Sequence, residues 1–421
     1  MSGETLPAQP WLTAPATIAV MSALEVEGGE GCARFVGGCV RDALLGRPVK
    51  DIDIATTLTP PRVLDALKTA GLRAIPTGID HGTITALADG RAFEITTLRR
   101  DVETDGRHAV VDFTKDWTHD AARRDFRLNA LYADREGRIF DPTGGGLADI
   151  KSGAIVFVGD PVARIREDAL RIPRFFRFMA WYGREVPDPA GVAACRELAA
   201  LIDGLSAERV SSELMKLLSA EDPRAAVGLM FDTGVMGRMV SDAENRDRFE
   251  ALVKIETEIL FTEDPLLRLA ALLPDDPVRA ARTARALRLS NTQRSRLTAA
   301  LTPEPSPQSR LVSWMSPRQT RQSLYRLGVQ AFSDRAMLAW AASDRPAAAI
   351  QWRALLSMGQ TWTPPTLPLN GDDVATAGVP QGPMIGAVLR EVEAWWIDQD
   401  FITDKLSVME RLKAVAQGMT F

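Results

Sequence analysis

The sequence predicts an α+β protein, in which an N-terminal α/β head with a mixed sheet is followed by an all-helical remainder. Over the first third of the chain, short β-branched strands alternate with helices. After about Val162 the pattern is helical almost without interruption, and it is rich in alanine, leucine and arginine. The length of 421 residues exceeds one ordinary hydrophobic core, so about two to four domains are expected.

The elements of the head are expected from alternation and from turn residues. Residues 100–117 are polar, charged and poorly periodic, and Asp105-Gly106 marks a turn, so this stretch is expected to be a flexible loop. Thr59 and two prolines favour the start of a helix. Strands are expected at residues 34–37, 51–55, 83–87 and 92–98, and helices at residues 41–45 and 61–70.

Composition bounds the class of protein. The chain is 46% hydrophobic and 25% charged, which is typical of a soluble globular protein, and no apolar run is long enough to span a bilayer. No signal peptide is expected in the first residues. The three cysteines have no metal-ligand spacing, which predicts a reducing compartment and a cytoplasmic location.

The distribution of charge is more informative than its sum. A net charge of −5 argues against a simple basic nucleic-acid binder. Between Arg279 and Arg326, however, ten arginines accompany a single acidic residue, Glu304. These cations repel each other unless a polyanion lies near, so we expect a stripe that binds a polyanion such as a nucleic acid; a solvated helix face is the alternative. The stripe has a spacing of three, which predicts one slowly drifting helix face: Arg279, Arg282, Arg285 and Arg288.

The most informative motif joins a double-glycine turn to a pair of carboxylates. Gly37-Gly38 follows an expected strand and begins a helix, which suits close approach to a phosphate. Asp51 and Asp53 alternate on the next strand, so they share a face and suit Mg²⁺. Together with Arg41, this combination predicts a nucleotidyl transfer site. The alternative is a tight turn beside a surface Asp pair.

Residues 122–131 are expected to open a helix with a polar face. Arg124 suits a phosphate or a ribose, and Asp125 suits a ribose hydroxyl. Asn129 would lie one turn further along the same face. A charged surface helix is the alternative.

A second arginine cluster predicts a surface that reads a base. Asp168, Arg171 and Arg174 are spaced three apart, so they are expected on roughly one helix face, with Arg177 continuing the row. A carboxylate beside a guanidinium matches the amino group and ring acceptor of adenine and cytosine, whereas guanine and uracil place a carbonyl there. The pattern predicts acceptance of ATP and CTP; an exposed salt-bridged helix is the alternative. Pro173 predicts a kink that would re-aim Arg174 and Arg177.

Taken in order, these motifs resemble a known family. Gly-Gly-x-Val-Arg-Asp, Asp-x-Asp, Arg-Arg-Asp-x-x-x-Asn-Ala and Glu-Asp-x-x-Arg make the chain similar to the bacterial CCA-adding tRNA nucleotidyltransferases. Bacterial poly(A) polymerases share that ancestry. The likeness is continuous over about residues 34–178, and a weaker one returns at residues 369–373 and 382–386.

The resemblance implies four parts with different tasks. A catalytic head at residues 1–155 would bind Mg²⁺ and the triphosphate, and a helical neck at 156–230 would recognise the base. A helical body at 231–302 and a helical tail at 303–421 would follow, with RNA binding in the tail.

The resemblance also implies roles for single residues. Asp51 and Asp53 would hold Mg²⁺, and Glu94 lies at a strand position from which a third catalytic carboxylate could act. The implied nucleotide-binding residues are Gly37, Gly38 and Arg41 at the triphosphate, Arg124, Asp125 and Asn129 at the ribose, Asp168 and Arg171 at the base, and Arg174 and Arg177 at the phosphates or the pocket.

The activity implied is template-independent addition of C, C and A to the tRNA 3′ end from CTP and ATP. The RNA 3′-hydroxyl would attack the α-phosphate in line, with two Mg²⁺ and release of pyrophosphate. The alternatives are a poly(A) polymerase that uses ATP only and a partial enzyme that adds only A or only CC. No membrane or protein partner is expected. A catalytically dead RNA-binding protein is disfavoured, because both metal carboxylates are present.

Overall fold

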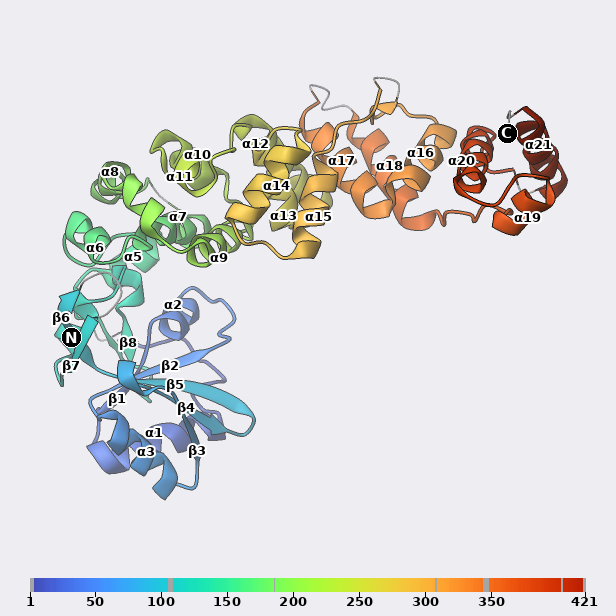
Figure 1. The fold of residues 1–421 in the computed structure, drawn as a ribbon. Helices are drawn as coiled ribbons and strands as arrows, with labels where there is room; N and C mark the ends of the chain where they lie inside the picture. Colours follow the sequence, from blue (N-terminus) through green and yellow to red (C-terminus); the bar gives the residue numbers. More distant parts are fainter. Residues whose placement is uncertain are drawn as a thin grey trace. The chain divides into compact units, whose positions relative to one another are not determined.

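The structure is a computed structural model that describes residues 4–104, 109–184, 186–306, 309–343, 348–402 and 404–418. It forms two compact units, Met1–Ser241 and Asp242–Phe421. The expected α+β class is confirmed, because the strands lie in the N-terminal third and the described residues after it are helical (Figure 1). The finer division into head, neck, body and tail stays a prediction.

A mixed seven-stranded sheet forms the core of the head. Its strand order is β3-β4-β5-β2-β1-β8-β9, with β2 and β5 parallel and the other neighbours antiparallel. All four expected strands are confirmed, whereas β3 was not expected. This edge strand holds a proline and has no buried alternation to reveal it. The strands are β1 (Ala33–Val36), β2 (Ile52–Thr56), β3 (Arg73–Gly78), β4 (Thr83–Ala88), β5 (Arg91–Thr97), β8 (Tyr132–Ala133) and β9 (Ile139–Phe140).

Three helices pack on this sheet. α1 (Pro15–Gly28) and α3 (Pro60–Thr69) contact each other and β4 (Figure 1). α2 (Gly38–Leu44) follows β1 directly and contacts β1 and β2. The two helices expected in this region are therefore confirmed as α2 and α3. A short 3₁₀ turn, η1 (Ile79–His81), links β3 to β4.

The stretch expected to be a flexible loop contains a second, two-stranded sheet. β6 (Arg99–Thr104) and β7 (Ala109–Phe113) pair antiparallel, so the loop prediction is wrong for these residues. Backbone pairing and the cross-strand ion pair of Arg100 with Asp112, 2.6 Å apart, compensate for the weak apolar pattern. The expected turn at Asp105-Gly106 lies outside the described residues.

Short helices complete the first unit. In an aromatic cluster, Phe175 and Phe178 of α7 pack against Phe126 and Phe157. α7 packs along α9. The elements are α4 (Trp117–Ala122), η2 (Arg127–Asn129), α5 (Gly146–Ser152), α6 (Pro161–Glu167), α7 (Arg171–Tyr182), α8 (Pro189–Glu197), η3 (Ala199–Gly204), α9 (Ala207–Leu218), α10 (Arg224–Asp232) and α11 (Val235–Met239).

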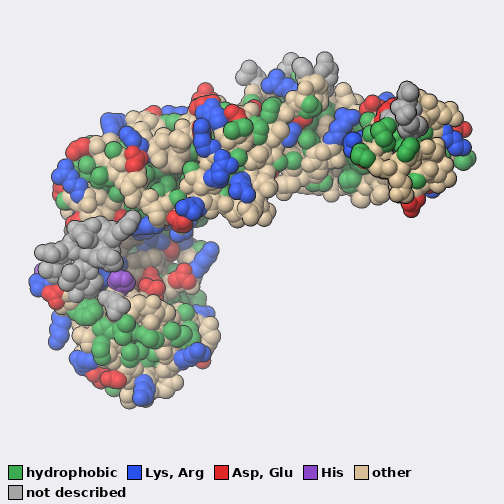
Figure 2. Space-filling model, in the orientation of Figure 1, with side chains coloured by type: hydrophobic (Ala, Val, Ile, Leu, Met, Phe, Trp, Pro, Cys, Tyr) green, Lys and Arg blue, Asp and Glu red, His purple; other side chains and the backbone are tan. Residues whose placement is uncertain are grey.

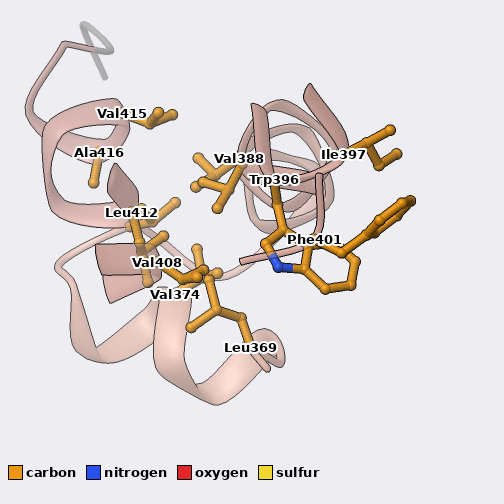
Figure 3. Close-up of a cluster of buried hydrophobic side chains, with 12 residues drawn as sticks. Leu369, Val374, Val388, Trp396, Ile397, Phe401, Val408, Leu412, Val415 and Ala416 are labelled. Carbon is orange, nitrogen blue, oxygen red and sulfur yellow. The ribbon is translucent and has the colours of Figure 1, made fainter. Parts of the chain in front are cut away.

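The second unit is helical over its described residues. α15 begins after Ser290, which forms a capping box with Gln293. Valines of α19, α20 and α21 pack with Trp396 and Leu412 in one buried cluster (Figure 3). The elements are α12 (Arg246–Ile255), the π-helix η4 (Glu256–Leu260), α13 (Pro265–Leu272), α14 (Pro277–Ala286), α15 (Asn291–Ala300), α16 (Pro317–Leu327), α17 (Val329–Ala341), α18 (Ala349–Thr361), α19 (Gly371–Thr376), α20 (Pro383–Asp398) and α21 (Lys405–Gly418).

The three cysteines are buried and none forms a disulfide. Burial raises the pKa of the Cys32 thiol to about 11 and that of Cys39 to about 12, and it also raises the pKa of Cys195. These thiols therefore behave as small apolar side chains. No helix in the described part of the chain is long and apolar enough to cross a membrane.

Candidate nucleotidyl transfer site

The sheet brings the predicted carboxylates to one place. In the parallel pairing of β2 with β5, Asp53 lies opposite Glu94, and Asp51 comes directly before β2. Ile52 and Ile54 are buried, so Asp53 points to the other face, where Ala55 joins a buried cluster. Asp53 is half-buried, while Asp51 and Glu94 are exposed. The carboxylates thus lie at the accessible end of an ordered strand pair.

The electrostatics of this face favour a cation. Burial, together with the charges of Glu94 and Asp51, raises the pKa of Asp53 to about 6, although Arg124 and Arg41 act the other way. Carboxylates held together in this way repel each other, and a bound cation relieves that repulsion. The same interactions show that Arg41 and Arg124 lie close to Asp53.

The donor set fits a divalent metal ion shared with a substrate. Within the described ranges, no three His, Cys, Asp or Glu side chains are grouped closely enough to enclose an ion. Magnesium sites commonly use one or two carboxylates, and water or substrate phosphates complete the coordination. The open pair of Asp51, directly before β2, and Asp53, on β2, suits that arrangement.

The glycine turn brings the backbone close to two predicted nucleotide-binding residues. Gly37 has a φ of 70°, in the left-handed region that favours glycine. A Cβ atom there would lie 3.6 Å from Nη1 of Arg124 and 3.7 Å from the carbonyl oxygen of Asn129. A helix N-terminus is equivalent to about half a positive charge, whereas each guanidinium carries a full one, so Arg41 and Arg124 supply most of the positive charge here.

A hydrogen-bonded chain joins four predicted nucleotide-binding residues. The buried Arg41 donates to Oδ1 of Asn129 at 2.7 Å, and Nδ2 of Asn129 donates to Oδ1 of Asp125 at 2.9 Å. Nε of Arg174 donates to Oδ2 of Asp125 at 2.9 Å. Although burial raises the pKa of Asp125, Arg174 and Asn129 more than offset it, so this pKa is lowered. The ring of Tyr182 lies 4.3 Å from the Arg41 guanidinium and supports it.

The expected helix over residues 122–131 is wrong. α4 ends at Ala122, a turn follows, and residues 127–129 form the 3₁₀ turn η2. The backbone N–H of Phe126 donates to Oδ1 of Asp125 at 2.8 Å, and Phe126 is extended. This local hydrogen bond competes with helix formation. Asp125 and Asn129 are adjacent because of their hydrogen bond and not because they share a helix face.

Asp120 is a buried residue of the site that the sequence analysis missed. It accepts from the Tyr132 hydroxyl at 2.7 Å and forms ion pairs with Arg124 at 3.0 Å and Arg123 at 2.8 Å. Burial raises its pKa, but the two guanidinium groups and the hydroxyl more than offset this effect and hold the pKa at about 2. Its spacing of three and four from the arginines was the signal available in the sequence.

The expected single helix face for Asp168, Arg171 and Arg174 is also wrong. α6 ends at Glu167, Asp168 is extended, and α7 begins only at Arg171. Oδ1 of Asp168 accepts from the N–H of Leu170 at 3.0 Å, a turn that interrupts the helix. The kink expected at Pro173 is not imposed, because Pro173 lies in the first turn of α7, where no backbone N–H is required.

α9 holds the other side chains of this cluster and was not expected to take part. Nη2 of Arg209 donates to Oδ2 of Asp168 at 2.8 Å. The buried Glu213 accepts from Nε of Arg177 at 2.5 Å. Arg171 donates to Glu167 and to the carbonyl oxygen of Arg164, both at 2.7 Å. The cluster is therefore a network of ion pairs between α6, α7 and α9.

The arginine stripe of the second unit is less regular than expected. α14 ends at Ala286, and Arg288 has a φ of 54°, so the four arginines do not share one helix. Arg279 and Arg282 both pair with Asp242, which comes from outside the stripe. Arg285 is exposed and has no ion pair with any residue that the structure describes. Figure 2 shows Lys and Arg side chains gathered over α14.

Comparisons with known proteins agree with this geometry. Residues 33–156 match the family described as Poly A polymerase head domain, and residues 187–245 match Probable RNA and SrmB-binding site of polymerase A. The chain is 33% identical over 403 residues to the mouse protein CCA tRNA nucleotidyltransferase 1, mitochondrial, covering 90% of this chain and 86% of that one. It is 32% identical to the CCA-adding enzyme of Limosilactobacillus fermentum, covering 98% and 100%.

Solved structures show the same fold. The Bacillus stearothermophilus CCA-adding enzyme in complex with CTP has a TM-score of 0.74 and 26% identity, covering 98% of this chain and 100% of that one. The Thermotoga maritima CCA-adding enzyme complexed with tRNA has a TM-score of 0.70 at 19% identity, covering 98% and 99%, and shows the fold alone.

A mixed-sheet head with clustered carboxylates, arginines and a close glycine turn defines a nucleotidyltransferase. Enzymes of this class generally use divalent metal ions. Within the class, the chain belongs to the family of CCA-adding enzymes.

Proposed function

We propose that this protein completes the 3′ end of tRNA by adding C, C and A from CTP and ATP, with release of pyrophosphate. The observation that carries the proposal is the convergence of Asp53, Glu94, Arg41 and Arg124 beside the glycine turn. The CCA-adding relatives, similar over nearly the whole chain, favour CCA addition over poly(A) synthesis. A cytoplasmic location suits three buried, unbridged cysteines.

Asp51 and Asp53 would hold Mg²⁺, which when bound lowers the pKa of the RNA 3′-hydroxyl and neutralises charge on the departing pyrophosphate. Glu94 lies opposite Asp53 and adds negative charge to the same face. Arg41 would bind the triphosphate, and its contacts with Asn129 and Tyr182 fix its guanidinium in place beforehand.

Arg124 and Asp125 would bind the ribose. Asp120 holds Arg124, and Asn129 and Arg174 hold Asp125, so both side chains are oriented before a nucleotide arrives. Arg177, held by Glu213, would complete the pocket.

Asp168 and Arg171 would read the base from the break between α6 and α7. The backbone N–H of Arg171 donates to the carbonyl oxygen of Asp168 at 3.0 Å, so the turn sets the spacing of the two side chains. A carboxylate that accepts an amino group rejects the carbonyl of guanine or uracil.

The proposal is tested with tRNA that lacks its 3′ end and with labelled nucleotides offered singly and in pairs. CTP alone should add two cytidines, ATP alone should add nothing to this RNA, and both together should complete CCA. Long products from ATP alone would show a poly(A) polymerase instead. Addition of only CC or only A would show a partial enzyme.

A further inference from the structure

The carboxylate of Asp168 is held at both of its oxygen atoms. Oδ1 accepts from the Leu170 N–H at 3.0 Å, and Oδ2 accepts from Nη2 of Arg209 at 2.8 Å. The side chain of Asp168 is 36% exposed and that of Arg209 is 45% exposed, so a ligand can reach the pair from solvent. The two donors come from different elements, the turn before α7 and the first turn of α9.

This arrangement leaves the carboxylate able to bind a further donor. An ionised carboxylate accepts about four hydrogen bonds, two on each oxygen. Among the residues that the structure describes, the Leu170 N–H and Arg209 occupy one position on each oxygen, so one position on each stays open. With one donor alone, the carboxylate could rotate about its Cβ–Cγ bond. With both donors in place, its plane is fixed.

Arg209 is carried by a well-anchored helix. Ser206 caps α9 by accepting from the Arg209 N–H, and Leu214, Leu217 and Leu218 are fully buried. Glu213, one turn after Arg209, holds Arg177 of α7. α9 is therefore a rigid support for side chains of the predicted pocket.

We infer that Arg209 is a positioning residue for nucleotide selection: it orients the Asp168 carboxylate toward the amino group of cytosine or adenine without contacting the nucleotide. The inference rests on the proposed base-reading role of Asp168. A guanidinium that instead competed with the nucleotide for Asp168 would have the opposite effect on affinity. The two open acceptor positions favour orientation over competition.

The test measures kcat and KM for each of the four nucleotides on tRNA lacking its 3′ end, with the full-length protein. The variants are Arg209→Ala, Arg209→Lys, Asp168→Ala and the double variant Asp168→Ala/Arg209→Ala. Arg238→Ala is the control, because Arg238 also forms an exposed ion pair in the same unit, 2.8 Å from Asp203. Melting curves confirm that each variant is folded.

Arg209→Ala should raise the KM for CTP and ATP about fivefold, with little change in kcat. A change of about fivefold is at the upper end of what an exposed ion pair contributes. Use of GTP and UTP relative to CTP should rise, and Arg209→Lys should restore part of the selection. In the Asp168→Ala background, removal of Arg209 should have no further effect, because Arg209 acts through Asp168.

Three results would overturn the inference: an Arg209→Ala variant that behaves like Arg238→Ala, a KM that falls, or an effect that persists in the Asp168→Ala background. If Asp168→Ala itself leaves selection unchanged, the base-reading role fails, and the inference fails with it. If Asp168→Ala relaxes selection and Arg209→Ala does not, only the role of Arg209 fails.

Discussion

We expect the carboxylates on and beside β2 to be needed for chemistry and not for folding. Asp51 is exposed and Asp53 is half-buried, and neither belongs to the hydrophobic core. Asp51→Ala or Asp53→Ala should lower kcat on the order of 10²–10³-fold or more, because the developing charge on the phosphate loses its stabilisation. Single-turnover addition of cytidine from CTP measures the rate of the chemical step, and a melting curve measures the stability of the fold. Near-normal turnover with Mg²⁺ would exclude these residues as ligands.

Asp120 should make the stability of the first unit depend on pH. Its folded pKa of about 2 lies below the ordinary value, so its contribution is present above about pH 4 and is lost as the pH falls toward 2. The loss amounts to about 1 kcal/mol by about pH 3. Denaturant unfolding should show that Asp120→Asn lowers the free energy of unfolding, and that the difference from the unaltered protein shrinks as the pH falls from about 5 to about 3. A difference that stays constant over this range would contradict the prediction.

At the scale of single residues, the sequence indicated the candidate site residues better than it indicated the residues that hold them in place. Asp53 and Glu94 each lie on a strand that the local pattern predicted, and the parallel pairing of β2 with β5 then places them opposite each other. Asp120 and Arg209 were missed because their importance depends on partners that the fold supplies. Arg209 lies 41 residues from Asp168, and no sequence periodicity connects them.

At the level of elements, four strands of the head and the helical character of the later chain were predictable, whereas the edge strand β3, the β6–β7 hairpin and the interruptions between helices were not. Asp125 and Asp168 each bind a nearby backbone N–H and so end a helical pattern that spacing alone favoured. Such residues have low helix propensity for this reason, yet propensity is a weak guide against a strong charge pattern.

The β6–β7 hairpin is a candidate for the element that reshapes the site between addition of C and addition of A. Residues 102–110 can be replaced by a two-residue turn that preserves the pairing of Arg100 with Asp112. CC addition should be spared, while the final A step should slow on the order of 10²-fold, because ATP is misplaced. The Arg100→Ala variant, with the hairpin at full length, is the control. Equal loss of both steps would argue against a switching role.

At the level of the whole molecule, an acidic protein must bind an acidic RNA. The net charge is −5, so any grip on the tRNA backbone depends on local groups of arginines. The arginines at α14 are the candidates, although Asp242 already compensates Arg279 and Arg282. RNA phosphates would have to share or displace that carboxylate, so the exposed Arg285 and Arg282 should matter more than Arg279.

Neutralising Arg282, Arg285 and Arg288 together should therefore raise the KM for tRNA and leave the KM for CTP and ATP unchanged. Each lost phosphate contact should reduce the slope of log affinity against log salt by about 0.7–0.9. A triple substitution of exposed, ion-paired arginines in the head is the control: Arg62, Arg135 and Arg138. An unchanged salt slope would show that these three arginines form a solvated surface only.

The buried cysteines make the protein suitable for site-directed labelling. Maleimide dyes react with the thiolate, and burial suppresses ionisation of Cys32, Cys39 and Cys195. The folded chain should therefore take up almost no dye, whereas the unfolded chain should take up three per molecule. Cysteines introduced at the exposed positions Lys68 and Lys413 would then be the reactive ones. A fluorophore pair at these positions, one in each unit, would report distance changes while C, C and A are added, without removal of any native thiol.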